Sequence, residues 1–372
     1  MVITFDFLRE KFSSLQCVKG NVRQISGLNQ LDGALSQEAS FLVDHRYRSL
    51  LKQCSAAVLI TNIEEFPYAQ EEFSGCIWHT PDPLSVLGGL ATVLEQERFG
   101  EDERWSEAGI HSTAIVEKGA QVHSSASVGP YCVVRKGASI GVSTSLLAYV
   151  YVGCHAKIEQ NCVIGVGASI LAYTKMGAGC RVMPGAVIGS QGFGVLRNRD
   201  GKNTRIPQLG QIVIGPQSRI GCNTTMDRGT FGETQLGARA YLDNLTQVGH
   251  NAQAGEDFIM CSQSGLTGSS KVGNRVTIGA LAGIKDHVQV TDDVTVTAMT
   301  GVIKDWMKPR TLLKGYPAAP LTEYLKQQSA FRKLPQLMKR VQELEREVEQ
   351  LRDRLNLSKS HGDSVELEHG ST

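Results

Sequence analysis

An aliphatic residue or methionine recurs at every sixth position through the middle of the chain. The series runs from Ile110 to Ile188 without a miss, fourteen positions in all. After an interruption it resumes over 214–226, and after a second interruption over 236–302. An α-helix repeats every 3.6 residues and an amphipathic strand every two, so neither produces this pattern.

A six-position unit fits a short strand that points one aliphatic side chain inward, followed by a turn. Three units make one triangular coil, and stacked coils form a parallel β-helix. Glycine often follows the aliphatic residue, as at Gly129, Gly165 and Gly249, and we expect these glycines where the backbone must bend. The 39 glycines and the low aromatic content of 6% suit many short strands and tight turns.

The two interruptions of the repeat predict inserted loops. The interval from Ile188 to Ile214 exceeds four repeats by two positions, and the interval from Met226 to Leu236 exceeds one repeat by four. Extra residues in a solenoid leave it as loops on one face, and such loops commonly belong to the binding site.

Outside the repeat the chain divides into flanking parts. Residues 1–105 combine helical patterns with strand-like runs, which predicts a small α/β domain. The β-helix is predicted over 106–308, C-terminal helices over 309–357 and a disordered tail over 358–372. The helical patterns lie at 5–16, 45–53 and 82–98, and the strand-like runs at 40–43 and 56–61.

In the C-terminal part, apolar residues follow the 4-3 spacing of a heptad seam, with charged residues around it. Such a seam usually needs a partner helix, so we expect self-association. The seam consists of Leu337, Val341, Leu344, Val348, Leu351 and Leu355.

Charge, cysteine content and hydropathy exclude several classes of protein. The 38 basic and 37 acidic residues give a net charge of +1, which implies no polyelectrolyte partner for the chain as a whole. The nine cysteines form no CxxC pair, so we expect small buried side chains in a reducing compartment rather than disulfides or a zinc site. We expect a cytoplasmic protein, because no signal peptide and no apolar run of about 18 residues is present.

Two histidines and a glycine fall on one edge of the predicted coil. Residues three repeats apart stack one coil apart, at about 4.8 Å. Gly268 follows His250 by three repeats, and His287 follows His250 by six repeats and one further position. A base, a small residue with an exposed N–H and a second polar group are the parts of an acyl-transfer site, although turn histidines can also be merely solvated. No further ligand occurs at the coil spacing, so we predict no metal site.

Several segments resemble the UDP-3-O-(3-hydroxyacyl)glucosamine N-acyltransferases of bacterial lipid A synthesis, which are left-handed β-helix proteins. The resemblance covers roughly residues 1–355 and includes the N-terminal domain, which the sister O-acyltransferases and sugar acetyltransferases lack. It predicts a mainly β fold, a left-handed parallel β-helix of hexapeptide repeats with an N-terminal α/β domain and C-terminal helices. The segments are FLVDHRY at 41–47, GFG at 192–194, IPQLG at 206–210, NTTMDRG at 223–229, DNLTQVGHN at 243–251, and the tail helices.

The resemblance implies a homotrimer with active sites between adjacent coils. It implies transfer of a 3-hydroxyacyl chain from acyl carrier protein to the 2-amine of a UDP-glucosamine substrate, without a cofactor. His250 matches the general base, Gly268 the oxyanion donor and His287 a histidine that contacts substrate. An imidazole has an ordinary pKa of about 6.5 and can take a proton from an amine near pH 7, so we expect direct transfer without a covalent acyl-enzyme.

The resemblance also places a uridine site in the N-terminal domain, where Phe41 and Tyr47 match the aromatics that hold the uracil. The family's usual Asn-Pro between them is Asp44-His45 here, and an ionised carboxylate accepts but does not donate hydrogen bonds. Asp44 is counted among the substrate-binding residues. So are two residues of the coil, Asp243, which we also expect to orient His250, and Asn244.

Basic residues gather just after the last repeat. From residue 304 to 340 there are nine basic residues and two acidic ones. Such a patch attracts an acidic partner, and acyl carrier proteins are acidic. We therefore predict a carrier-binding surface at Lys304, Lys308, Arg310 and Lys314, with a solvated helix face as the alternative. Nucleic acid is not expected, because the patch contains no recognised binding module.

Two other functions remain open at this stage. One is a β-helix acyltransferase that uses coenzyme A or makes an ester, against which the Phe41 and Tyr47 domain argues. The other is a purely structural solenoid, which needs neither the inserted loops nor a polar column at the coil spacing.

Overall fold

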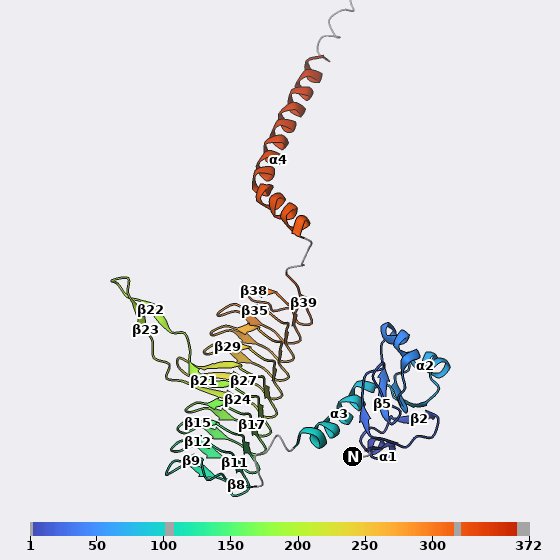
Figure 1. Ribbon diagram of the computed structural model, residues 1–372. Coiled ribbons are helices and arrows are strands. Elements are labelled where there is room, and N and C mark those ends of the chain that lie inside the picture. Colours follow the sequence, from blue (N-terminus) through green and yellow to red (C-terminus); the bar gives the residue numbers. More distant parts are fainter. Residues whose placement is uncertain (1–2, 101–107, 316–320, 363–372) are drawn as a thin grey trace, which may run out of the picture. The chain divides into compact units, whose positions relative to one another are not determined.

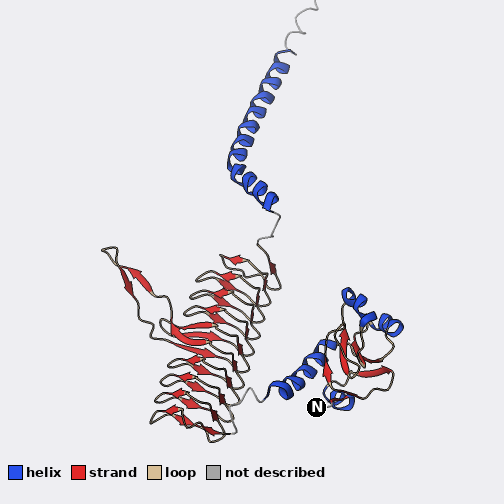
Figure 2. Ribbon diagram, viewed as in Figure 1, coloured by secondary structure: helices blue, strands red, loops and turns tan. Residues whose placement is uncertain are grey.

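The computed structural model describes residues 3–100, 108–315 and 321–362 (Figure 1). The chain separates into two compact units, residues 1–314 and 315–372. Within the first unit, an α/β domain precedes residue 101 and a β-helix follows residue 107 (Figure 2). The predicted fold class, a mainly β left-handed parallel β-helix with flanking α/β and helical parts, is confirmed.

The α/β domain is built on a five-stranded sheet with the strand order β2-β7-β6-β5-β4. Its three central strands are apolar, and Trp78 of β7 packs against Phe5 with ring centroids 5.1 Å apart. The strands of the domain are β1 (Ile3–Thr4), β2 (Gln16–Lys19), β3 (Gln24–Ile25), β4 (Gly27–Leu28), β5 (Glu38–Leu42), β6 (Val58–Thr61) and β7 (Cys76–His79). The helices are α1 (Phe5–Lys11), the 3-10 helix η1 (His45–Gln53), α2 (Phe66–Glu72) and α3 (Pro83–Phe99).

The sequence pattern overestimates the length of the first helix of this domain. A helical pattern was expected over 5–16, but α1 ends at Lys11 and strand β2 begins at Gln16. Ser13 and Ser14 form a turn between them, as serine side chains compete for backbone groups and favour turns. Helix α2 was missed because it is only seven residues long, too short for a clear period.

The β-helix has three parallel sheets, one for each side of the coil, and most of its strands are very short. Strands pair three repeats apart in sequence, for example Val134 with Val152. The first sheet contains β8 (Gly109–Ile110), β11 (Ser127–Val128), β14 (Ser145–Leu146), β17 (Val163–Ile164), β20 (Arg181–Val182), β25 (Arg219–Ile220), β28 (Tyr241–Leu242), β31 (Ile259–Met260), β34 (Thr277–Ile278), β37 (Thr295–Val296) and β39 (Leu312–Leu313).

The second sheet contains β9 (Ile115–Val116), β12 (Val133–Val134), β15 (Tyr151–Val152), β18 (Ser169–Ile170), β21 (Val187–Gln191), β26 (Thr225–Arg228), β29 (Gln247–Val248), β32 (Gly265–Leu266), β35 (Gly283–Ile284) and β38 (Gly301–Val302). The third contains β10 (Gln121–Val122), β13 (Ser139–Ile140), β16 (Lys157–Ile158), β19 (Lys175–Met176), β24 (Gln211–Ile214), β27 (Glu233–Leu236), β30 (Gln253–Ala254), β33 (Lys271–Val272) and β36 (Gln289–Val290). We call the turn that follows a strand of the first sheet the first corner. The turns that follow strands of the second and third sheets are the second and third corners.

From residue 126 onward each repeat buries two side chains, not one as the period alone suggested. The second inward side chain precedes the aliphatic residue by two positions and is usually small, most often Ala, Ser, Thr or Cys, although Phe258 also occupies this position. Cys132, Cys162 and Cys180 occupy this position and are fully buried. The predicted burial of cysteine is therefore confirmed for these three.

Apart from Gly189 (φ 89°), the glycines that directly follow the aliphatic residues are not in the left-handed conformation. The left-handed conformation instead falls two positions later, for example at Tyr131 (φ 58°) and Tyr149 (φ 61°). At Gly141 a Cβ atom would lie 2.5 Å from the carbonyl carbon of Glu159 in the next coil. These glycines therefore permit close approach between coils.

The coil extends beyond its predicted end at residue 308, because β39 still pairs with β37 in the first sheet. In the second unit, α4 runs from Leu321 to Gly362 with Pro335 inside it, and Figure 1 shows the helix bent. The expected disorder from residue 358 is wrong for 358–362, which belong to α4, and 363–372 lie outside the described residues. No helix in the described ranges is both long and apolar enough to cross a bilayer.

Candidate active site

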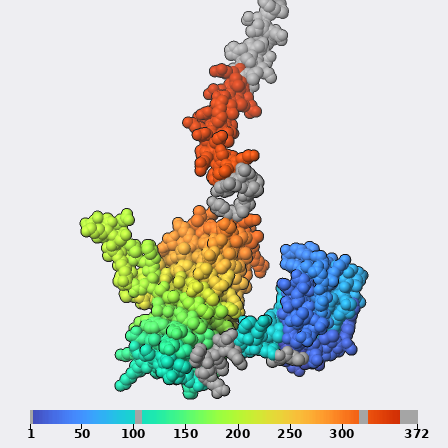
Figure 3. Space-filling view, in the orientation of Figure 1, coloured from blue at the N-terminus to red at the C-terminus, as the bar shows by residue number. Residues whose placement is uncertain are grey.

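Both interruptions of the repeat leave the coil at the second corner. The first follows β21, projects as the antiparallel hairpin β22 (Val195–Arg197) and β23 (Asn203–Arg205), and returns at β24. The second lies between β26 and β27. Figure 3 shows the hairpin standing out from the surface of the coil. The expectation that the extra residues leave on one face is confirmed.

The structure places His250, Gly268 and His287 on successive coils at this same corner. The backbone N–H of Ser269 donates to the carbonyl oxygen of His250 at 2.8 Å. That of His287 donates to the carbonyl oxygen of Gly268 at 3.2 Å. His250 and Gly268 are half-buried and His287 is exposed, so the column borders solvent.

The imidazole of His250 lies between two glycines. A Cβ atom on Gly268 would be 2.7 Å from His250 Nε2, so this nitrogen faces the Gly268 backbone. On the other side Gly192, from the first interruption, approaches so closely that a Cβ there would be 2.7 Å from His250 Cβ. Side chains at either position would displace the ring.

The backbone N–H of Gly268 is available to a ligand. In several other turns the equivalent N–H is capped by a carboxylate, as Glu117 caps Lys136 at 2.8 Å and Glu159 caps Ala178 at 3.1 Å. No acceptor for the Gly268 N–H occurs in the described part of the chain. An uncapped amide beside an imidazole can stabilise a developing oxyanion.

The other ring nitrogen of His250, Nδ1, faces two oxygen atoms. They are Thr230 Oγ1 and Asn251 Oδ1, each at 3.3 Å. The Asn251 amide is fixed because its Nδ2 donates to the Phe231 carbonyl at 2.6 Å and its Oδ1 accepts from the Thr230 N–H at 2.8 Å. Sequence reasoning missed Thr230, for which the position of the second interruption was the available signal, and Asn251, which directly follows His250.

Asp243 and Asn244 lie at the first corner, which is a different edge of the coil from His250. Asp243 accepts from the N–H groups of Asn244 at 2.7 Å and Ser262 at 3.1 Å. Both residues border a surface pocket of about 420 Å³. Within one chain the expectation that Asp243 orients His250 is wrong, because Nδ1 faces Thr230 and Asn251 instead.

The predicted uridine-binding residues surround the end of β5 in the α/β domain. Phe41 is half-buried in β5, and Tyr47 in η1 is 51% exposed. Asp44 caps η1 and accepts from the Arg46 N–H at 2.9 Å and from its guanidinium. These hydrogen bonds lower the pKa of Asp44 to about 2, so it is ionised at neutral pH. The Arg46 guanidinium lies 5.9 Å from the Tyr47 ring centroid.

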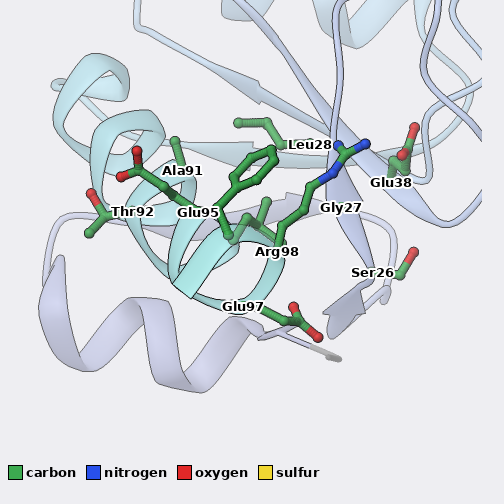
Figure 4. A pocket seen from close by; sticks show the side chains of 11 residues that line it. Ser26, Gly27, Leu28, Glu38, Ala91, Thr92, Glu95, Glu97 and Arg98 are labelled. Atoms are coloured by element: carbon green, nitrogen blue, oxygen red, sulfur yellow. The ribbon is translucent and has the colours of Figure 1, made fainter. Parts of the chain in front are cut away.

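A separate pocket of about 690 Å³ lies between β4 and the last turns of α3, where Arg98 extends towards Glu38 (Figure 4). Phe41, Asp44 and Tyr47 do not line this pocket.

The four predicted carrier-binding residues, Lys304, Lys308, Arg310 and Lys314, are all exposed where the coil ends. Arg310 is close enough to Asp293 to help lower the pKa of that carboxyl. Among the described residues no group of three or more His, Cys, Asp or Glu side chains is arranged to hold a metal ion.

No protein-family model matches the chain. Solved structures with local similarity include UDP-N-acetylglucosamine O-acyltransferase from Moraxella catarrhalis, 27% identical over 53% of this chain and 67% of that one, with a TM-score of 0.41. The corresponding acyltransferase from Campylobacter jejuni is 25% identical over 57% and 73%, with a TM-score of 0.43.

Curated relatives match over most of the chain. The UDP-3-O-acylglucosamine N-acyltransferase of Pseudomonas entomophila is 34% identical over 326 residues, 88% of this chain and 90% of that protein. The one from Coxiella burnetii is 30% identical over 83% and 87%. The match to the Methylococcus capsulatus protein is 37% identical but spans only 44% and 46%. On the two long matches, this chain belongs to the UDP-3-O-acylglucosamine N-acyltransferase family.

Proposed function

We propose that this protein transfers a 3-hydroxyacyl chain from acyl carrier protein to the 2-amine of UDP-3-O-(3-hydroxyacyl)glucosamine, in the cytoplasmic synthesis of lipid A. Family membership supports N-acyl transfer to a UDP-sugar. The observation that carries the mechanism is the approach of His250 Nε2 to the backbone of Gly268, whose N–H has no acceptor in the described chain.

In the proposed reaction the sugar amine attacks the thioester carbonyl carbon and a C–N bond forms. His250 Nε2 takes the proton that the nitrogen loses, while the Gly268 N–H donates to the carbonyl oxygen as it becomes negative. When the intermediate collapses, the C–S bond breaks and His250 returns the proton to the leaving sulfur. The products are the amide and the free thiol of the carrier, with no acyl-enzyme.

The proposed site is completed by a second copy of the chain. Asp243 and Asn244 lie at the first corner and His250 at the second, so one chain does not bring them together. In a homotrimer the first corner of one copy can face the second corner of its neighbour, which would join Asp243 and Asn244 to His250 and His287. The exposed apolar positions of α4, from Leu337 to Leu351, support the same self-association.

We assign the remaining substrate contacts to the α/β domain and to the C-terminal end of the coil. Phe41 and Tyr47 would hold the uracil, with Arg46 as the nearby donor. The exposed residues Lys308 and Arg310 belong to the proposed carrier surface.

The test combines the purified protein with 3-hydroxyacyl carrier protein and UDP-3-O-acylglucosamine. Mass spectrometry should detect the amide, with one free carrier thiol released per amide formed. His250→Ala should lower the rate about 10²- to 10⁴-fold and leave the sedimentation coefficient of the trimer unchanged. Preference for a coenzyme A thioester, formation of an ester on a hydroxyl acceptor, or a His250→Ala rate within a few-fold of wild type would contradict the proposal.

A further inference from the structure

Each interruption of the repeat contributes one polar side chain to a group of hydrogen-bonded residues next to the imidazole of His250. Gln208 comes from the first interruption and Thr230 from the second. Neither residue occupies a position that the six-residue period defines, so the coil itself does not require these side chains. Gln208 is nevertheless only 3% exposed, which makes it one of the few buried polar side chains outside the repeat.

The two side chains form a directional hydrogen-bond chain that ends at His250. Gln208 Nε2 donates to the Ile206 carbonyl at 3.1 Å. This bond fixes the orientation of the amide, so Gln208 Oε1 lies on its other side and acts as an acceptor. Thr230 Oγ1 donates its single hydrogen to Gln208 Oε1 at 2.7 Å. Towards His250 Nδ1, 3.3 Å away, the Thr230 hydroxyl can therefore act only as an acceptor.

A neutral imidazole carries one N–H, and its position is set by the partner of each nitrogen. Nδ1 of His250 faces two acceptors, Thr230 Oγ1 and the fixed Asn251 Oδ1. The proton is therefore held on Nδ1, and Nε2 keeps its lone pair on the side of Gly268. A base that accepts a proton at Nε2 needs this tautomer.

We propose that Gln208 and Thr230 are positioning residues that hold His250 in the Nδ1–H tautomer. The catalytic consequence rests on the proposed function, but the tautomer is a property of the resting protein. Without Gln208 the Thr230 hydroxyl is free to donate to Nδ1, which would favour the Nε2–H form that cannot act as the base. The chain of bonds therefore works as a unit.

The kinetic test uses variants that keep the shape of each side chain. Thr230→Val removes the acceptor, and we expect kcat to fall roughly 10- to 100-fold with the Michaelis constants for both substrates within about threefold of wild type. Thr230→Ser restores the hydroxyl and should recover most of the rate. Gln208→Leu should resemble Thr230→Val, and the double variant should be no slower than either single variant, because the residues act through one bond to His250.

The matched control is Thr144→Val, which removes a buried threonine hydroxyl from an early coil, where it donates to the Glu159 carbonyl at 2.6 Å. It should alter thermal stability without changing kcat. Wild-type kcat in Thr230→Val, or losses in the double variant that simply multiply, would overturn the proposal.

The spectroscopic test does not depend on turnover. In protein labelled with ¹⁵N-histidine, the His250 signals are identified by their absence from His250→Gln. The wild type should show a protonated Nδ1 and an unprotonated Nε2, and Thr230→Val should move the population towards Nε2–H. A wild type in the Nε2–H form would overturn the proposal. If the tautomers behave as expected but no amide is formed in the transfer assay, the proposed function fails and the assignment of the tautomer stands.

Discussion

Gly268 lies so close to His250 that a single methyl group on its α-carbon would sit 2.7 Å from His250 Nε2. The two residues are three repeats apart in sequence, one full coil, and the second corner stacks them. The space next to Nε2, where the proposed reaction places the substrate amine, is therefore open only because residue 268 has no side chain.

Gly268→Ala should stop the reaction while leaving the fold intact. The φ angle of Gly268 is outside the left-handed region, so alanine is tolerated by the backbone, but its methyl group displaces the imidazole. We expect a fall in kcat of at least about 100-fold, the scale of a lost general base, and little change in the midpoint of thermal unfolding.

The control is Gly301→Ala, because a Cβ atom at Gly301 meets nothing within 4 Å. This variant should retain full activity. Comparable rates for Gly268→Ala and Gly301→Ala would mean that Nε2 does not face the reacting atoms.

Tyr47→Ala should weaken binding of the UDP-sugar without slowing the bound complex. The ring is exposed on η1 and belongs to the α/β domain, whereas the proposed base belongs to the coil. Loss of binding remote from the reacting bond raises the Michaelis constant and leaves kcat largely unchanged. Steady-state kinetics with varied UDP-sugar measures both.

The matched control is Phe7→Ala, which removes an exposed aromatic from α1 of the same domain. It should leave both constants unchanged. A Tyr47→Ala variant with a lower kcat and an unchanged Michaelis constant would contradict the assignment of the uracil site.

The sequence predicted the coil and the column of candidate site residues because one period governs both. Once residues three repeats apart are known to stack, the neighbours of His250 along the second corner follow by addition. The same addition does not predict the positions of Gln208 and Thr230, because both residues lie in interruptions, where no repeat determines which residues stack. Asp243 and His250 occupy different corners, and the sequence reveals this only when the turns between the two residues are counted.

The α/β domain was less accessible to sequence reasoning because its elements are short and its key contact is local. Asp44 was expected to touch the nucleotide, yet its carboxylate is engaged by Arg46, two residues later. Asp side chains commonly bond to the backbone two residues on, so the signal was present in the spacing.

A ladder of alternating charges at the third corner should make the coil sensitive to acid. Arg239 Nε bonds Asp257 at 2.7 Å, and Arg275 Nε bonds Asp293 at 2.7 Å, on four successive coils. Hydrogen bonds from Arg239 lower the pKa of Asp257, and those from Arg275 lower the pKa of Asp293. An unfolded aspartate has a pKa of about 3.9. The stabilisation is therefore complete above about pH 4 and is lost as the pH falls through the lower folded values.

Arg239→Gln with Arg275→Gln should lower the midpoint of thermal unfolding at pH 7. The difference from wild type should shrink below about pH 4, as the carboxylates become protonated, and also in 1 M salt, because these side chains are partly exposed. Arg332→Gln, an exposed arginine of α4, serves as the control and should have no such pH dependence. A difference that persists unchanged at pH 3 would show that the ladder does not act through these carboxylates.

Reversing Lys308, Arg310 and Lys314 to Glu should raise the Michaelis constant for the acyl carrier protein. All three are exposed at the end of the coil, where a concentrated positive charge speeds the encounter with an acidic protein. We expect an increase of roughly tenfold or more at low salt, with the constant for the UDP-sugar unchanged. The difference from wild type should decrease as salt rises, because exposed charges are screened beyond about 10 Å at 0.1 M.

The hairpin of β22 and β23 supplies a control with the same change in net charge. Arg197, Arg199 and Lys202 are also exposed, and reversing them to Glu changes the total charge by the same amount. If overall charge alone governed the encounter, both triple variants would show the same Michaelis constant for the carrier. A local docking surface at the end of the coil requires the first variant to have the higher Michaelis constant for the carrier, and the reverse order would place the carrier on the hairpin.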